Sequence, residues 1–410
     1  MQQLTNQQRL KPWMGFVLFA VTVAFLFFIG SAMQTVWGVA GLVATEAGFL
    51  IIAIAYALIF RIPLKEMFPI KKFTFKDFFG AAFLVGGGVS FGMISILIVG
   101  MLYPASLNGS DVKAFEMLYG EGAGFIFMMF AISLMPAICE EAIQRGAIIA
   151  NFRTIKKDWV IVLIMGLFFG LFHLSALRFI NTAIMGACLS YIVVKKNNIL
   201  LSAIMHFSVN FLSSSYSWFV SVILNGSGNR NLSEQVAQLT PEAMKSALPS
   251  YLFMGLAAPF FIVLGLMLLN PVKHKKIRFL FAGIVTAIMF VSGVAIAATS
   301  LNTQTVVKTN MSYTIDIENS DSSPVEFNIA DEGSYSVAVV IMNVPAESQY
   351  SVRIEKANGK VVSNGMFTSS AFKTYTKQIG LEPGDYRLYI VNGFGTKGEK
   401  PAVSVQINKI

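Results

Sequence analysis

The chain has 410 residues, of which 55% are hydrophobic and 13% are charged, and its mean hydropathy is +0.64. Soluble domains carry about 25% charged residues, so this composition excludes an ordinary soluble protein and predicts a polytopic membrane protein. The net charge of +9 does not indicate a nucleic-acid partner, because the Lys and Arg residues cluster in short loops between apolar runs, where they set topology.

The apolar runs predict an all-α membrane bundle of about nine transmembrane helices, since a crossing needs roughly 20 apolar residues. The expected spans are 13–33, 36–60, 79–103, 123–152, 159–174, 179–194, 199–224, 251–269 and 279–299. With nine spans all the basic segments fall on one side, which the positive-inside rule makes cytoplasmic. We therefore expect a multi-pass cell-membrane protein with a cytoplasmic N-terminus and an extracytoplasmic tail after residue 300.

The tail has the sequence pattern of a small all-β sandwich. Apolar and polar residues alternate in several short segments, which is the period of a half-buried strand. These segments are Tyr313–Ile317, Tyr335–Val339, Tyr350–Ile354, Tyr386–Ile390 and Val403–Ile407. Asn358-Gly359 predicts a hairpin turn. The tail has no His and no Cys, so we expect it to bind an unknown ligand or to act structurally.

Two carboxylates and a guanidinium interrupt the apolar run that forms the fourth expected span. Charged groups inside a membrane are costly and usually face a cavity or a partner. Residues four apart share a helix face, so Glu141 and Arg145 are placed to form an ion pair, while Glu140 shares its face with Gln144. Glu140 then has no local cation and is free to act as a general base or acid.

Two later spans carry polar groups at the same spacing. Phe169 and His173 share one helix face, and His206 and Asn210 share another. A His/Asn pair can supply two donors to a developing oxyanion. Counted from the nearest basic loops at 1.5 Å per residue, Glu140, His173 and Asn210 reach a similar depth, roughly 20 Å. Each motif alone is also typical of hydrogen bonds that join helices.

The ordered set of motifs resembles the CPBP family, the Abi group of intramembrane proteases related to Rce1-type CAAX prenyl endopeptidases. The resemblance rests on Glu140-Glu141-x-x-x-Arg145-Gly146, Phe169-x-x-x-His173 and His206-x-x-x-Asn210. It implies hydrolysis of a peptide bond in a membrane protein or peptide. Glu140 and His173 would activate the attacking water, and His206 and Asn210 would hold the oxyanion. Glu141, Arg145, Gln144 and Phe169 would support the site.

The resemblance covers only Glu140 to Asn210. The apolar runs and the change of pattern after residue 300 divide the chain into N-terminal helices (1–122), the catalytic core that holds these motifs (123–224), C-terminal helices (225–300) and the β tail (301–410). Gln144 departs from the family, which often has an aromatic residue there. The resemblance favours no cofactor. Zinc is the alternative, in a metallo-endopeptidase whose ligands would be Glu140, His173 and His206.

Two other functions also fit the intramembrane polar groups. A membrane scaffold or bacteriocin-immunity protein would keep these helices and act by binding. A proton-coupled transporter would use Glu and His as a relay.

Overall fold

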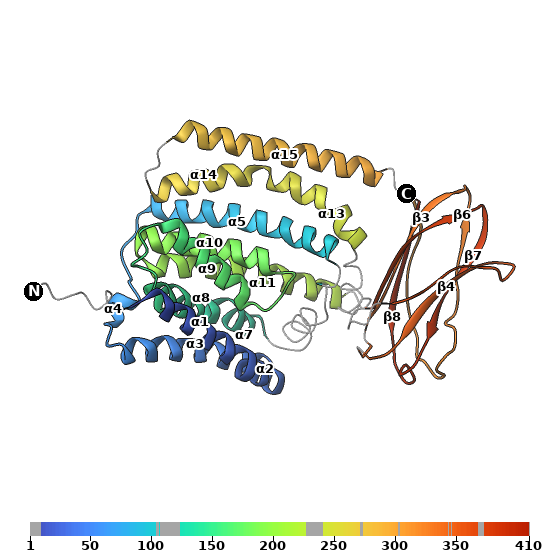
Figure 1. Cartoon of the computed structure of the whole chain (residues 1–410), viewed down its shortest axis with the longest axis horizontal. Coiled ribbons are helices and arrows are strands. Elements are labelled where there is room, and N and C mark those ends of the chain that lie inside the picture. Colours follow the sequence, from blue (N-terminus) through green and yellow to red (C-terminus); the bar gives the residue numbers. More distant parts are fainter. Residues whose placement is uncertain are drawn as a thin grey trace, which may run out of the picture. The chain divides into compact units, whose positions relative to one another are not determined.

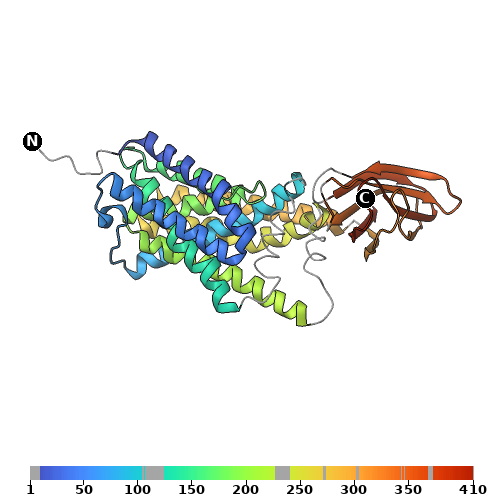
Figure 2. The same ribbon diagram turned by 90° about the horizontal axis from the view of Figure 1, so that it is seen from below.

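The computed structural model describes residues 10–103, 106, 124–226, 241–270, 274–301, 304–342, 344–345, 347–367 and 373–409 (Figure 1). The chain divides into two compact units, one mostly helical and one that contains the β-strands. In the first unit the long helices run alongside one another (Figure 2). Many of their large apolar side chains point outward, for example Phe28, Ile51 and Ile59, as a surface that faces lipid requires.

Eight helices among the described residues are long and apolar enough to cross a membrane. Several of them contain π-helical or 3-10 segments. The elements are α1 (Pro12–Ala24), η2 (Phe25–Gly30), α2 (Ser31–Trp37), α3 (Val39–Ile59), α5 (Phe75–Leu102), α7 (Phe125–Met129), η4 (Phe130–Leu134), α8 (Met135–Glu141), η5 (Ala142–Ile148), α10 (Phe179–Lys196), α11 (Ile199–Gly226), α13 (Pro241–Met254), η6 (Gly255–Ala257), α14 (Ala258–Leu269) and α15 (Lys275–Leu301). A short helix, α4 (Leu64–Met67), precedes α5.

The remaining expected span is a shorter helix. Helix α9 (Asp158–Phe172) has 15 residues, about 22 Å, against a hydrocarbon core of about 30 Å. It ends at His173, its C-cap, and Leu174 then takes a positive φ of 49°. Lys195 pairs with Asp158 at 2.5 Å and so ties the base of the α9–α10 hairpin together. A helix that begins at one membrane surface and has this length brings His173 to a position inside the membrane.

Helix α8 lies between two π-helical segments, η4 and η5. Pro136 near its start has no N–H to donate to the carbonyl of Ile132, four residues earlier. The side-chain amide of Asn210 on α11 donates to this carbonyl at 3.2 Å. A neighbouring helix thus satisfies a backbone group near a proline, as membrane helices require. π-Helical turns are frequent at functional sites.

The tail forms two four-stranded antiparallel sheets, with orders β1-β8-β3-β6 and β2-β7-β4-β5. Both sheets contribute to one apolar core, to which Val337 and Val352 belong. The strands are β1 (Gln304–Ser312), β2 (Val325–Ile329), β3 (Gly333–Met342), β4 (Tyr350–Lys356), β5 (Val361–Met366), β6 (Lys373–Leu381), β7 (Gly384–Asn392) and β8 (Ala402–Lys409). The expected sandwich is therefore present.

The hairpin turn expected at Asn358-Gly359 joins β4 to β5, and Gly359 has a φ of +84° there. The strand expected at 313–317 is wrong, because β1 ends at Ser312. Ile315 is buried, as its alternation indicates, but its backbone bonds to Gly398 and Glu399 in a loop. Ile315 is therefore buried without a sheet ladder, whereas Ile317, two residues later, is 70% exposed.

Candidate active site

Glu141 is a buried carboxylate whose two oxygens are fully used by neighbouring side chains. Its Oε1 accepts from Arg145 Nη1 at 2.9 Å and lies 3.1 Å from His206 Nδ1. Its Oε2 accepts from Ser202 Oγ at 2.6 Å. The residue is 1% exposed. Glu141 is therefore the group that joins α8 to α11 and orients the His206 ring.

Arg145 completes the charge balance of Glu141 and reaches a third helix. Its Nη2 donates to the carbonyl of Gly186 on α10 at 3.1 Å. Its guanidinium carbon lies 4.3 Å from the centroid of the Phe169 ring, which is a cation–π geometry. Arg145 is fully buried, so the ion pair, the carbonyl and the ring replace part of its hydration, and its Nε has no hydrogen-bond partner among the described residues.

The Phe169 ring is the contact point between the motifs. His173 packs edge-on to it with centroids 4.8 Å apart, and His206 does so at 5.7 Å. Gly186 makes this packing fit, because a Cβ at that position would lie 2.4 Å from Phe169 Cβ. Phe169 thus holds both imidazoles and the guanidinium at one place between α8, α9, α10 and α11.

Gly186→Ala is expected to displace Phe169 and so to lower both stability and activity. Overpacking of this kind costs about 1–3 kcal/mol, and the shift reaches His173 and His206 through the ring. The thermal unfolding midpoint of the detergent-solubilised protein measures the first effect. Gly86→Ala on α5 is the matched control, because a Cβ there meets nothing within 4 Å. Equal midpoints for the two variants would contradict this account of Phe169.

Glu140 differs from Glu141 in having little local compensation. Glu140 is 7% exposed, and its Oε2 has no hydrogen-bond partner among the described residues. Among the described residues, His206 lies within ion-pair distance of that oxygen, with Nε2 3.8 Å away. His206 therefore lies between two carboxylates, held by Glu141 through Nδ1 and facing Glu140 through Nε2.

His173 and Asn210 are placed differently from this pair. His173 Nδ1 lies 2.8 Å from the carbonyl of Phe169. Because a carbonyl only accepts, Nδ1 must carry the proton, and Nε2 is left as an acceptor. Asn210 uses one amide N–H on the carbonyl of Ile132 and keeps the second. Gln144 is fully buried, and both of its side-chain polar atoms lack a hydrogen-bond partner among the described residues.

The expected zinc ligands do not fit a three-ligand metal site. Among the described residues no three His, Cys, Asp or Glu side chains lie in a group that could hold a metal ion. Glu140, His173 and His206 all lie in the described part of the chain. His206 binds Glu141 through Nδ1 only, which leaves Nε2 exposed to Glu140. The arrangement supplies a carboxylate and imidazoles that can transfer protons.

A further buried carboxylate, Glu46 on α3, belongs to the same region. Glu46 is 3% exposed and interacts electrostatically with Glu140. Glu46 was not predicted as a site residue, although a single Glu inside the apolar run 36–60 is the same signal that marks Glu140. Glu46 belongs to none of the three motifs, which lie on later helices.

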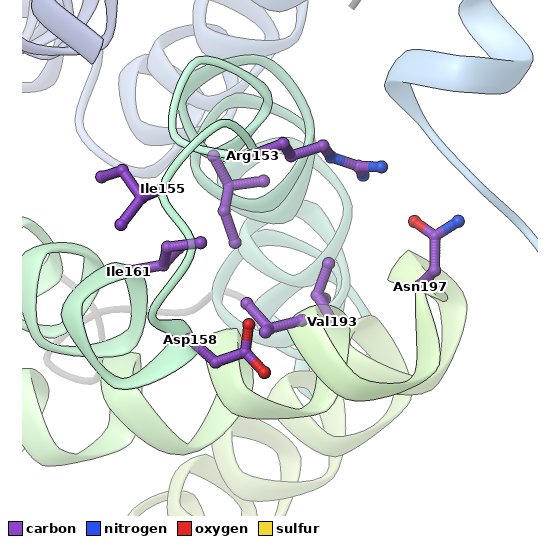
Figure 3. Close-up of a pocket in the computed structure, with 8 residues that line it drawn as sticks. Arg153, Ile155, Asp158, Ile161, Val193 and Asn197 are labelled. Atoms are coloured by element: carbon purple, nitrogen blue, oxygen red, sulfur yellow. The ribbon is translucent and has the colours of Figure 1, made fainter.

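A separate cavity of about 230 Å³ lies near the loop that follows η5 and at the α10 C-terminus (Figure 3). Its lining includes Arg153, Asp158 and Asn197. Arg153 follows Glu140 by 13 residues, so this cavity is at the basic end of the helices and is distinct from the candidate site.

The family model described as Type II CAAX prenyl endopeptidase Rce1-like matches residues 122–212. The chain contains an Rce1-like segment. That segment includes Glu140, His173, His206 and Asn210, and also Glu141 and Phe169, which both contact His206. A search of curated proteins finds no match to the chain.

Solved structures match only a minor part of the chain. One is an isomalto-dextranase of Arthrobacter globiformis T6 complexed with panose, at 21% identity and a TM-score of 0.17, with 20% of this chain and 15% of that chain covered. A carbohydrate-binding module from Cellvibrio mixtus lichenase 5A, in complex with cellotriose, has 18% identity and a TM-score of 0.19. The match covers 26% of this chain and 90% of the module. The C-terminal module of a Zobellia galactanivorans laminarinase has 11% identity and a TM-score of 0.18. The match covers 26% of this chain and 100% of that module. TM-scores this low do not establish a shared fold.

Proposed function

We propose that the protein is an intramembrane endopeptidase of the glutamic type, which hydrolyses a peptide bond in a membrane-associated protein or peptide. The observation that carries the proposal is the pair formed by Glu140 and His206. Glu141 and Arg145 neutralise each other and brace the helices, whereas Glu140 faces the His206 Nε2 without an ion pair of its own on α8. The Rce1-like match to 122–212 supports the same reaction class.

In this mechanism Glu140 removes a proton from a water molecule, and the water oxygen attacks the carbonyl carbon of the peptide bond. His173 Nε2, an acceptor, orients the same water. Glu140 then delivers the proton to the leaving amine as the C–N bond breaks. A positioned general base and acid of this kind contributes about 10²–10⁴-fold to the rate.

The developing oxyanion would be stabilised by His206 and Asn210. His206 already has Nδ1 against the Glu141 carboxylate, so Nε2 can donate only when the ring is doubly protonated. In that form the charges of Arg145 and His206 balance those of Glu140 and Glu141. The free N–H of Asn210 is the second donor.

The test is proteomics of membrane proteins from cells that carry the wild type, Glu140→Ala or His206→Ala at matched expression. The proposal predicts one or more membrane proteins that remain uncut in both variants and are cut in the wild type. Identical peptide profiles, with variants that fold and localise normally, would overturn the proposal and favour a scaffold or immunity role.

We also propose that the N-terminus is cytoplasmic and that the β-sandwich is extracytoplasmic. The positive-inside rule supports this orientation, because the basic segments alternate with nearly neutral loops. With an epitope after Ile410, protease added to intact cells should remove the epitope. Survival of the epitope on intact cells, with loss after lysis, would reverse the topology.

A further inference from the structure

Glu46 is a buried acid that the proposed mechanism does not use. It lies on the α3 face that is turned inward, the face that also buries Phe49, Ala53 and Tyr56. These positions repeat at helical spacing, so Glu46 occupies a place where an apolar side chain would be expected. A carboxylate retained there needs polar neighbours.

The register between α3 and the Glu140 helix places Glu46 beside the site. Tyr56 donates its hydroxyl hydrogen to Asn151 Oδ1 at 2.7 Å. Glu46 is ten residues before Tyr56, and Glu141 is ten residues before Asn151. Both segments run in the same direction and α3 packs against α8 and η5, so Glu46 lies level with Glu140 and Glu141 to within about one helical turn.

Each of the two acids has a buried oxygen that no side chain among the described residues satisfies. Glu46 Oε2 and Glu140 Oε2 are both buried and lack a hydrogen-bond partner among the described residues. The two carboxyl groups interact electrostatically, and the Cys139 thiol interacts with both. On its other side Glu140 Oε2 lies 3.8 Å from His206 Nε2, which is beyond a direct hydrogen bond.

We propose that Glu46 and Glu140 together hold an internal water molecule between α3 and α8, and that Glu46 is a positioning residue of the site. Water is the ligand that fits, because it can donate one hydrogen to each carboxylate and still accept from an N–H. Buried waters typically make about three such bonds to otherwise unsatisfied groups. With both hydrogens directed at carboxylates, this water is distinct from the attacking water that His173 Nε2 orients, and it holds the Glu140 carboxylate in place toward that water.

The water site can be tested without a substrate. X-ray radiolysis of water produces hydroxyl radicals inside the protein, and mass spectrometry finds the side chains that they oxidise. Cys139 is the reporter, because it is 1% exposed and interacts electrostatically with both acids. Cys188 is the internal control, because it is also buried, at 8%, and contacts the carbonyl of Leu84 instead.

Cys139 should be oxidised several-fold faster than Cys188 in the wild-type protein in liposomes. Glu46→Leu should reduce Cys139 oxidation to the level of Cys188, and Glu46→Gln, whose amide still binds water, should largely restore it. Equal oxidation of the two thiols in the wild type, or no change in Glu46→Leu, would overturn the proposal.

The catalytic role of Glu46 rests on the proposed function. On a substrate found by the membrane proteomics, Glu46→Leu should lower kcat with little change in KM, and Glu46→Gln should recover most of kcat. Thr22→Val is the control, because Thr22 is buried but bonds only within its own helix, to the carbonyl of Leu18. Unchanged kcat in Glu46→Leu would overturn the positioning role. Selective Cys139 oxidation without any proteolysis would keep the water site and overturn the proposed function.

Discussion

Glu140→Gln is expected to reduce peptide hydrolysis by about 10²–10⁴-fold while the protein remains folded. The amide has nearly the same shape as the carboxylate, but it cannot take a proton from water. The 3.8 Å approach to His206 survives in the variant, so KM should change little and kcat should fall. The measurement is steady-state cleavage by purified protein in liposomes of a substrate found by the proteomics.

The matched control is Asp158→Asn, at the base of the α9–α10 hairpin. Asp158 also contacts a cationic group, Lys195, but it is half-exposed and belongs to the first turn of α9. It should retain wild-type kcat. A Glu140→Gln protein that cleaves as fast as the control would contradict the assignment of Glu140 as the base.

Removing one partner of the Glu141–Arg145 pair is expected to cause the largest loss of stability. Both side chains are almost fully buried and 2.9 Å apart. Breaking a buried pair from one side costs about 3–5 kcal/mol, because the remaining charge is left uncompensated. Arg145→Met should therefore lower the thermal unfolding midpoint in detergent sharply, and Glu141→Gln should do so as well, since it also weakens the hold on His206.

The double variant Glu141→Leu/Arg145→Met distinguishes the effect of the ion pair on stability from its effect on activity. Replacement of a buried pair by apolar residues is often neutral or stabilising, so the double variant should recover much of the stability lost by Arg145→Met. It should not recover activity, because His206 has lost the carboxylate that orients it. A double variant as unstable as the sum of the single variants would contradict this account of the pair.

Features that depend on spacing along one helix were predictable from the sequence. The four-residue interval placed Glu141 against Arg145, and the structure contains that pair. The apolar runs predicted the membrane helices, and the alternation in the tail predicted four of the strands. Each of these is a local property of the backbone period.

Contacts between helices were less predictable, because they depend on how each helix is rotated about its axis. The direct neighbour of both glutamates is His206, and nothing in its spacing to Asn210 indicates this. Phe169 joins the motifs through its ring packing. This packing is possible only because Gly186 has no side chain that would collide with Phe169. Asn210 bonds to a carbonyl next to a proline, a partner that only the folded chain reveals.

The most direct test of the central claim is hydrolysis in water enriched in heavy oxygen. Purified wild-type protein and Glu140→Gln, in liposomes that also contain the candidate substrate, would be incubated in that water and the products analysed by mass spectrometry. The account predicts new carboxyl termini that carry the heavy isotope with the wild type and are nearly absent with the variant. Equal formation of labelled termini by both proteins would contradict a glutamate-activated hydrolysis at this site. So would the absence of labelled termini with both proteins when the substrate is bound.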